Sequence, residues 1–102
     1  MEFKRWGYDF DGAYPNCNSL SNKPGIYVIW CKENESWKVL DVGESEDVRK
    51  RVCNHDRYKC WQEHCNSTIY YSATYTPELD EDERKNIEKT IREVTDPPCG
   101  DR

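Results

Sequence analysis

The pattern of hydrophobic and polar positions along the chain predicts three strands. Residues 25–31 are apolar or aromatic almost throughout, which is typical of a strand covered on both faces. Residues 37–42 predict a second strand, and the polar residues 32–36 between the two predict a hairpin turn. Residues 68–75, which are rich in β-branched and aromatic side chains, predict a third strand that ends before Pro77.

Alternation along the first two strands assigns their side chains to faces. The first strand carries two apolar sets, with Ile26, Val28 and Trp30 on one face and Tyr27, Ile29 and Cys31 on the other. In the second strand the same rule places Trp37, Val39 and Asp41 on one face and Lys38, Leu40 and Val42 on the other. The first strand is therefore expected in the centre of the sheet.

A helix is predicted directly after the second strand. Ser45 is a candidate N-cap, and Val48 and Val52 supply an apolar side. Arg51 and His55 stand four residues apart, so a helix that includes both presents them on one face. The helix is expected to end between His55 and Cys65.

A second helix is predicted near the end of the chain. Asp80 offers an N-cap with Glu83 three residues later, which resembles a capping box. The apolar residues that follow recur at helical spacing as far as Val94, so the helix is expected to run to about Thr95, before two prolines. Glu88 lies at the edge of that apolar stripe.

These elements predict an α+β domain with a small three-stranded antiparallel sheet flanked by helices, formed by residues 25–102. Residues 1–24 mix aromatic side chains with turn formers and show no lasting periodicity, so we expect an irregular N-terminal arm that packs on the domain. A chain of 102 residues fits one domain.

Charge restricts how such a domain can bind nucleic acid. The net charge of −5 excludes binding over the whole surface, because phosphate contacts come from Lys and Arg. The charge is unevenly distributed, however: residues 78–83 are acidic, whereas a basic stretch contains Arg49, Lys50, Arg51, Arg57 and Lys59. Arg49, Lys50, Arg57 and Lys59 are the residues expected to contact nucleic acid.

The N-terminal sequence predicts a cytoplasmic protein without membrane contact. It has no apolar stretch typical of a signal peptide, and no run is long enough to cross a bilayer. Six cysteines are therefore expected as reduced thiols. Cys53, Cys60, His64 and Cys65 lie close together in the sequence, but the absence of a C-x-x-C pair disfavours a structural zinc site.

Four side chains have the chemistry that phosphodiester hydrolysis needs. Arg51 has a planar fork that matches phosphate, and His55 can transfer a proton near neutral pH. Glu88 can ligate Mg²⁺, and Tyr27 can orient or deprotonate water. Each residue also has a purely structural explanation: Arg51 and His55 can belong to a solvated helix face, Glu88 can be an exposed glutamate, and Tyr27 can be a ring of the core. The residues by themselves therefore indicate only a small α+β domain.

An ordered set of motifs resembles the GIY-YIG nuclease family. Gly25-Ile26-Tyr27 matches the family's first motif, and residues 43–51 followed by His55 match its G-x-S-x-D-L-x-x-R-x-x-x-H pattern almost position for position. Ile87-Glu88 and the ending Pro97-Pro98-Cys99 are similar to the family's later signature. The similarity spans residues 25–100. Two positions depart from it: Asp41 replaces the tyrosine of the second motif, and Gly100 replaces a frequent asparagine.

The resemblance implies a metal-dependent DNA endonuclease. In that case Arg51 stabilises the phosphate charge, Glu88 holds a single Mg²⁺ or Mn²⁺ ion, and Tyr27 and His55 assist water activation, with Asp41 as a substitute base or a second carboxylate. DNA is the expected substrate, with RNA as an alternative, and a partner protein or a homodimer would supply targeting. Two other functions remain open: a nucleic-acid-binding module with an impaired site, and a protein-interaction domain that uses residues 78–83.

Overall fold

One antiparallel sheet of five strands, in the order β1-β2-β5-β3-β4, carries the fold. The computed structural model describes residues 2–100. Along the chain the elements are β1 (Glu2–Arg5), β2 (Tyr8–Tyr14), a short 3₁₀ turn (Cys17–Ser19), β3 (Gly25–Glu33), β4 (Ser36–Ser45), α1 (Val48–Cys53), α2 (Tyr58–Glu63), β5 (Thr68–Tyr75) and α3 (Glu81–Thr95). The chain is α+β as expected, but the prediction of a three-stranded sheet is wrong.

The two additional strands come from the segment that was expected to be an irregular arm. β1 and β2 form a hairpin whose turn residues Trp6 and Gly7 both have positive φ, at 51° and 84°. Tight hairpins favour such turns, but tryptophan is an unusual residue at positive φ, so the turn is not evident in the sequence. Phe10 of β2 is fully buried, and the ring of Phe3 stacks on it at 5.5 Å between centroids.

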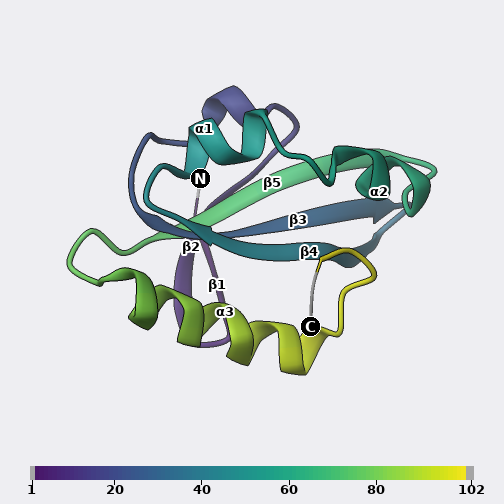
Figure 1. Ribbon diagram of the computed structural model, residues 1–102. Helices are drawn as coiled ribbons and strands as arrows, with labels where there is room; N and C mark the ends of the chain where they lie inside the picture. The colour runs from purple at the N-terminus through teal and green to yellow at the C-terminus, as the bar shows by residue number, and fades with distance from the viewer. Residues whose placement is uncertain (1, 101–102) are drawn as a thin grey trace.

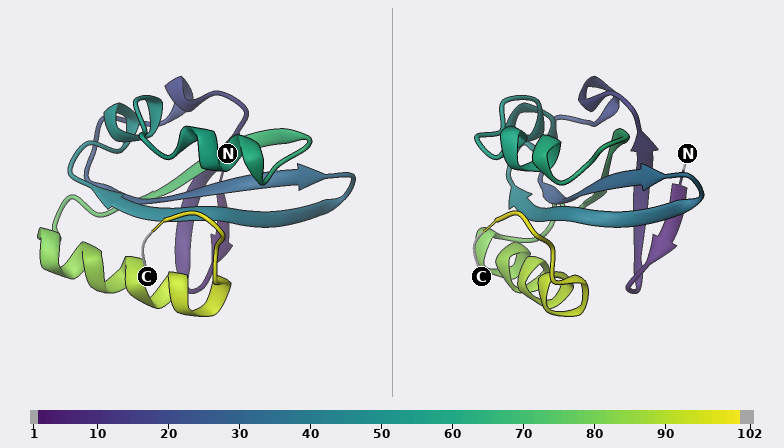
Figure 2. Two further views of the ribbon diagram at one scale, coloured as in Figure 1. Left: turned by 45° about the vertical axis from the view of Figure 1, so that its right-hand side comes forward. Right: turned by 90° about the vertical axis from the view of Figure 1, so that its right-hand side faces the viewer.

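Helices cover the two faces of the sheet separately. Figure 1 shows α1 and α2 over one face and α3 over the other, with β4 as the edge strand between them. The right-hand view of Figure 2 shows α3 beneath β4, with β1 and β2 on the other side of the molecule. The edge strand β4 is therefore within reach of side chains from both helical layers.

Each face of β3 packs in its own hydrophobic cluster, as the alternation predicted. Tyr27, Ile29 and Cys31 lie in the cluster beneath α1 and α2, and Ile26, Val28 and Trp30 lie in the cluster that contains Ile91 of α3.

In β4 the predicted alternation is wrong, because a bulge interrupts the register. Ile29 pairs with Asp41 but the next residue, Trp30, pairs with Val39, so Leu40 is an extra residue. Leu40 consequently packs beneath α1 and α2, whereas Val39 and Val42 both pack on the α3 side.

The helix expected from Ser45 through His55 is shorter than predicted and is followed by a second one. β4 continues to Ser45, and the side chain of Asp47 is the N-cap, accepting from the backbone N–H of Lys50 at 3.2 Å. α1 ends at Cys53, and His55 lies in the break before α2. α3 begins as predicted, with a complete capping box between Asp80 and Glu83.

The expectation of reduced thiols is wrong, because all six cysteines are paired. The disulfides are Cys17–Cys53, Cys31–Cys65 and Cys60–Cys99, with Cα–Cα distances of 5.5, 5.6 and 6.0 Å. Disulfides persist in oxidising compartments and are rare in the cytosol, which argues against the cytoplasmic expectation. No helix within residues 2–100 is long and apolar enough to cross a membrane.

If the N-terminal hairpin belongs to the core, Phe10→Ala will lower the free energy of unfolding by about 3–5 kcal/mol, the usual cost of removing a buried phenylalanine ring. Guanidinium unfolding of the oxidised protein measures this. Lys4→Ala in the same hairpin removes a side chain that is 72% exposed, and will change stability by less than about 0.5 kcal/mol. Equal stability of the Phe10 variant and the wild type would contradict the fold described for residues 2–14.

Candidate active site

A tyrosine and a histidine meet at the sheet edge on the α1 side. Tyr27 pairs with Gly43 across β3 and β4, and its hydroxyl lies 2.6 Å from Nε2 of His55. Gly43 makes this arrangement possible, since a Cβ at that position would lie 2.1 Å from the Tyr27 hydroxyl oxygen. The Gly of the family pattern therefore has a steric reason in this chain: it provides the space that the phenol occupies.

The hydrogen bonds of His55 determine which ring nitrogen carries the proton. Its Nδ1 accepts from the backbone N–H of Arg57 at 3.0 Å, so the proton of the neutral ring is on Nε2. Nε2 therefore donates to the oxygen of Tyr27. Burial, with the charges of Arg51 and Arg57, lowers the pKa of His55 to about 4, which keeps the ring neutral at pH 7.

Tyr27 is a hydrogen-bond donor at neutral pH. Burial raises the pKa of its hydroxyl to about 12, the cations Arg57 and Arg51 lower it, and the carboxylates Asp41 and Glu88 raise it. The oxygen accepts from Nε2 of His55, so the proton of the Tyr27 hydroxyl does not form this hydrogen bond. The charges of Arg51 and Glu88, which come from helices on opposite faces of the sheet, both act on the pKa of this hydroxyl.

Arg51 is held loosely enough to bind a ligand. Its guanidinium lies 2.9 Å from the carboxylate of Asp56, and the Arg51 side chain is 37% exposed. The predicted helical face that would carry both Arg51 and His55 does not exist, because the helix ends before His55. The two residues still converge, since the same oxygen of Asp56 lies 2.9 Å from the Arg51 guanidinium and 3.5 Å from Nδ1 of His55.

Glu88 reaches the edge from α3 and is only partly neutralised. Its Oε2 accepts from Nε of Arg92 at 3.1 Å, and the side chain is 25% exposed. Burial raises the pKa of Glu88, and the nearby charge of Glu44 acts in the same direction. Glu44 is itself held by Arg84, whose Nε donates to it at 2.9 Å.

Asp41 is fully buried and surrounded by donors. Five N–H groups donate to its carboxylate: Val42 N, Arg57 Nε, Arg57 Nη2, Trp61 Nε1 and Arg92 Nη2, at distances from 2.7 to 3.2 Å. A carboxylate offers about four lone-pair sites, so these donors saturate it. Asp41 therefore does not fit the role of substitute base or metal ligand, and its contacts make it a structural centre.

The residues expected to contact nucleic acid have different surroundings. Lys50 and Lys59 are exposed and Arg49 is partly exposed, all on α1 and α2. Arg57 is instead committed to Asp41, with Nε 2.8 Å from the carboxylate. Three of the four residues are thus available for a phosphate backbone.

Sequence reasoning missed Arg92 and Trp61. Arg92 follows Glu88 by four residues on α3, and Trp61 follows Arg57 by four residues. The first spacing is typical of a helical ion pair and was a usable signal. Nothing in the sequence indicated that both side chains would converge on Asp41.

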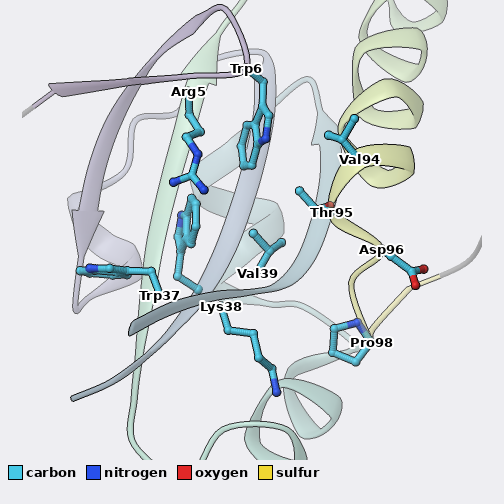
Figure 3. Close-up of a pocket in the computed structure, with 10 residues that line it drawn as sticks. Arg5, Trp6, Trp37, Lys38, Val39, Val94, Thr95, Asp96 and Pro98 are labelled. Carbon is cyan, nitrogen blue, oxygen red and sulfur yellow. The ribbon is translucent and has the colours of Figure 1, made fainter. Parts of the chain in front are cut away.

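Three surface hollows lie elsewhere on the molecule. The one shown in Figure 3, about 570 Å³, lies between the β1–β2 turn, β4 and the end of α3, and is lined by residues that include Arg5, Trp6, Trp37 and Val94. The second, about 380 Å³, shares Arg5, Trp30 and Trp37 with the first. The third, about 440 Å³, is lined mainly by residues of β5 and α2. Tyr27, Arg51, His55 and Glu88 line none of these three.

Asp41→Asn will lower the free energy of unfolding by about 3–5 kcal/mol, because it removes the buried negative charge that the guanidinium groups of Arg57 and Arg92 share. Chemical unfolding followed by tryptophan fluorescence measures the loss. Asp9→Asn is the matched control, since the Asp9 side chain is 72% exposed, and it will stay within about 0.5 kcal/mol of wild type. A tolerated Asp41→Asn change would show that the carboxylate is not a structural centre.

The imidazole of His55 will titrate in the folded protein with a midpoint near pH 4. The folded pKa of about 4 lies below the ordinary value of 6.5, so the unfolded chain binds more protons between these two pH values. Stability from this group is present above pH 6.5 and is lost as the pH falls to 4. An NMR titration of the assigned His55 ring measures the midpoint, and a value of 6 or above would contradict the buried neutral ring.

Comparison of the chain with protein-family models, with curated proteins and with solved structures finds no match in any of the three.

Proposed function

We propose that the chain is a divalent-metal-dependent endonuclease that hydrolyses DNA phosphodiester bonds. The observation that carries the proposal is the hydrogen bond between Tyr27 and His55 at the sheet edge, where Asp56 lies 2.9 Å from Arg51 and 3.5 Å from His55, and where the charge of Glu88 acts on the Tyr27 hydroxyl. The resemblance to GIY-YIG nucleases in residues 25–100 supports the same reading. The three disulfides favour an oxidising compartment for this activity.

The side chains near Glu88 fit one small divalent ion. Mg²⁺ usually binds through one or two carboxylates and keeps several waters. Glu88 and Glu44 lie close enough for the charge of Glu44 to raise the pKa of Glu88, and each carboxylate has one oxygen held by an arginine. Glu88, with Glu44 beside it, would hold the ion, which when bound supplies charge neutralisation for the phosphate.

The remaining chemistry belongs to side chains on the α1 side of the edge. Arg51 would exchange Asp56 for a phosphate, which its planar fork binds through two N–H groups. Tyr27 would direct its hydroxyl at the attacking water while His55 fixes the position of the phenol oxygen. Burial raises the pKa of Tyr27 to about 12, so the phenol keeps its proton at neutral pH and would orient the attacking water by a hydrogen bond without taking its proton.

A specific observation favours a second function, DNA binding without cleavage. Asp41 stands at the position of the family's second tyrosine, and its carboxylate is saturated by donors, so it cannot replace that phenol. Exposed Lys50 and Lys59 would still contact a phosphate backbone. This function predicts binding that weakens steeply with salt and yields no cut product.

Incubation of supercoiled plasmid with the oxidised protein and Mg²⁺ or Mn²⁺ separates these functions. The wild type will nick the plasmid, and Arg51→Ala and Glu88→Ala will each reduce the rate by about 100-fold or more, the usual loss when one charge-stabilising group is removed. Glu93→Ala is the matched control on α3, because Glu93 is exposed. Circular dichroism will show that all variants are folded. No cleavage by wild type with either ion, or cleavage unchanged in both active-site variants, would exclude the endonuclease.

A further inference from the structure

Cys60, His64 and Cys99 form a cluster of potential metal ligands outside the candidate active site. Their Sγ and ring nitrogen atoms all lie within 4.8 Å of one another, and this is the one such group of three within residues 2–100. Cys60 lies on α2 and His64 is the C-cap residue four positions later, while Cys99 comes from the segment after α3. His64 is exposed, so the cluster is open to solvent on that side.

The donor set matches zinc. Zn²⁺ prefers four ligands in a tetrahedron and binds cysteine thiolate and histidine nitrogen, and sites with three protein ligands take water as the fourth. Two ligands four residues apart on one helical turn are a recurrent way to hold this ion. The sequence disfavoured zinc because it has no C-x-x-C pair, and the third ligand, Cys99, is 39 positions from Cys60.

We propose that these three residues bind one Zn²⁺ ion when the Cys60–Cys99 disulfide is reduced. A dithiol would donate two electrons and two protons to the disulfide, giving two cysteine thiols and its own oxidised disulfide. Zn²⁺ then displaces the two thiol protons and takes a ring nitrogen of His64 and one water. The disulfide and the zinc site are therefore alternative cross-links between the same two segments.

Both cross-links serve the same structural purpose. The backbone N–H of Cys99 donates to the carbonyl of Leu40 at 3.0 Å, and its own carbonyl accepts from Nη1 of Arg92 at 3.1 Å. Cys60 precedes Trp61, which donates to Asp41. A bond between positions 60 and 99 thus holds α2 and the C-terminal segment around the Asp41 cluster, with disulfide chemistry under oxidising conditions and zinc under reducing conditions.

Titration of the reduced chain with Co²⁺ and then Zn²⁺ tests the proposal. The protein is reduced with a phosphine, desalted and titrated without oxygen. The wild type will bind one Co²⁺ per chain with the absorption of tetrahedral thiolate coordination, and Zn²⁺ will displace it. The oxidised wild type will show no such absorption. If reduction unfolds the protein, recovery of the folded circular dichroism spectrum on addition of Zn²⁺ also supports the site.

Variants identify the ligands. His64→Ala keeps both cysteines and changes an exposed residue. It will weaken Zn²⁺ binding by at least about tenfold, because even the loss of a residue that only supports a ligand usually costs that much affinity. Cys99→Ser will abolish the thiolate absorption of a two-sulfur site. The double variant Cys17→Ser and Cys53→Ser, which removes a different disulfide, will bind as the wild type does. Absence of metal binding by the reduced wild type, or unchanged binding in His64→Ala or Cys99→Ser, would overturn the proposal. The result does not depend on nuclease activity.

Discussion

The buried carboxylate of Asp41 is the interaction on which the rest of the edge depends. β4 is an edge strand, and the bulge at Leu40 turns Asp41 toward the space between the two helical layers. Arg57 and Trp61 reach the carboxylate from the α2 side and Arg92 reaches it from α3. A buried charge is costly unless it is paired and hydrogen-bonded. Loss of any of these three donors would therefore destabilise the fold around the carboxylate.

This interaction connects the two positions at which the chain departs from the GIY-YIG pattern. Arg92 donates to Asp41, to the carbonyl of Val42 and to the carbonyl of Cys99, and so fills the space beside the C-terminal segment. A Cβ at Gly100 would lie 2.2 Å from Nη2 of Arg92. Asparagine therefore does not fit at position 100 while Arg92 occupies that place. The guanidinium of Arg92 therefore lies next to both position 41 and position 100.

The Asp41 cluster also supports the candidate site. Asp41 positions Arg57, whose backbone N–H fixes the tautomer of His55. His55 in turn holds Tyr27 above Gly43. Arg92 of the same cluster also donates to Glu88, so the cluster contacts the candidate site from the α3 side as well.

The sequence predicts the parts of the fold that local rules determine. The two faces of β3, the strand β5 and the capping box of α3 all follow from alternation, composition and cap chemistry. The β1–β2 hairpin was missed because its turn places Trp6 at positive φ, and the bulge in β4 leaves no mark in the alternation.

Long-range pairing is the other part that the sequence could not supply. The pairs Cys60–Cys99 and Arg92–Asp41 join residues that are 39 and 51 positions apart. Side-chain spacing within one helix or strand carries no information about such contacts. The motifs were enough to select Tyr27, Arg51, His55 and Glu88 as candidate site residues. Only the three-dimensional contacts show that Asp41 is saturated by donors and does not belong with them.

A double-mutant cycle between Arg57 and Arg92 tests the central claim most directly. The two arginines lie on opposite sides of the edge strand and share the carboxylate of Asp41 as a partner. Unfolding free energies of Arg57→Met, Arg92→Met and the double variant will show a coupling above about 1 kcal/mol, as residues of one buried network do. Effects that add to within about 0.5 kcal/mol would mean that the two arginines act independently, and would contradict an edge organised by Asp41.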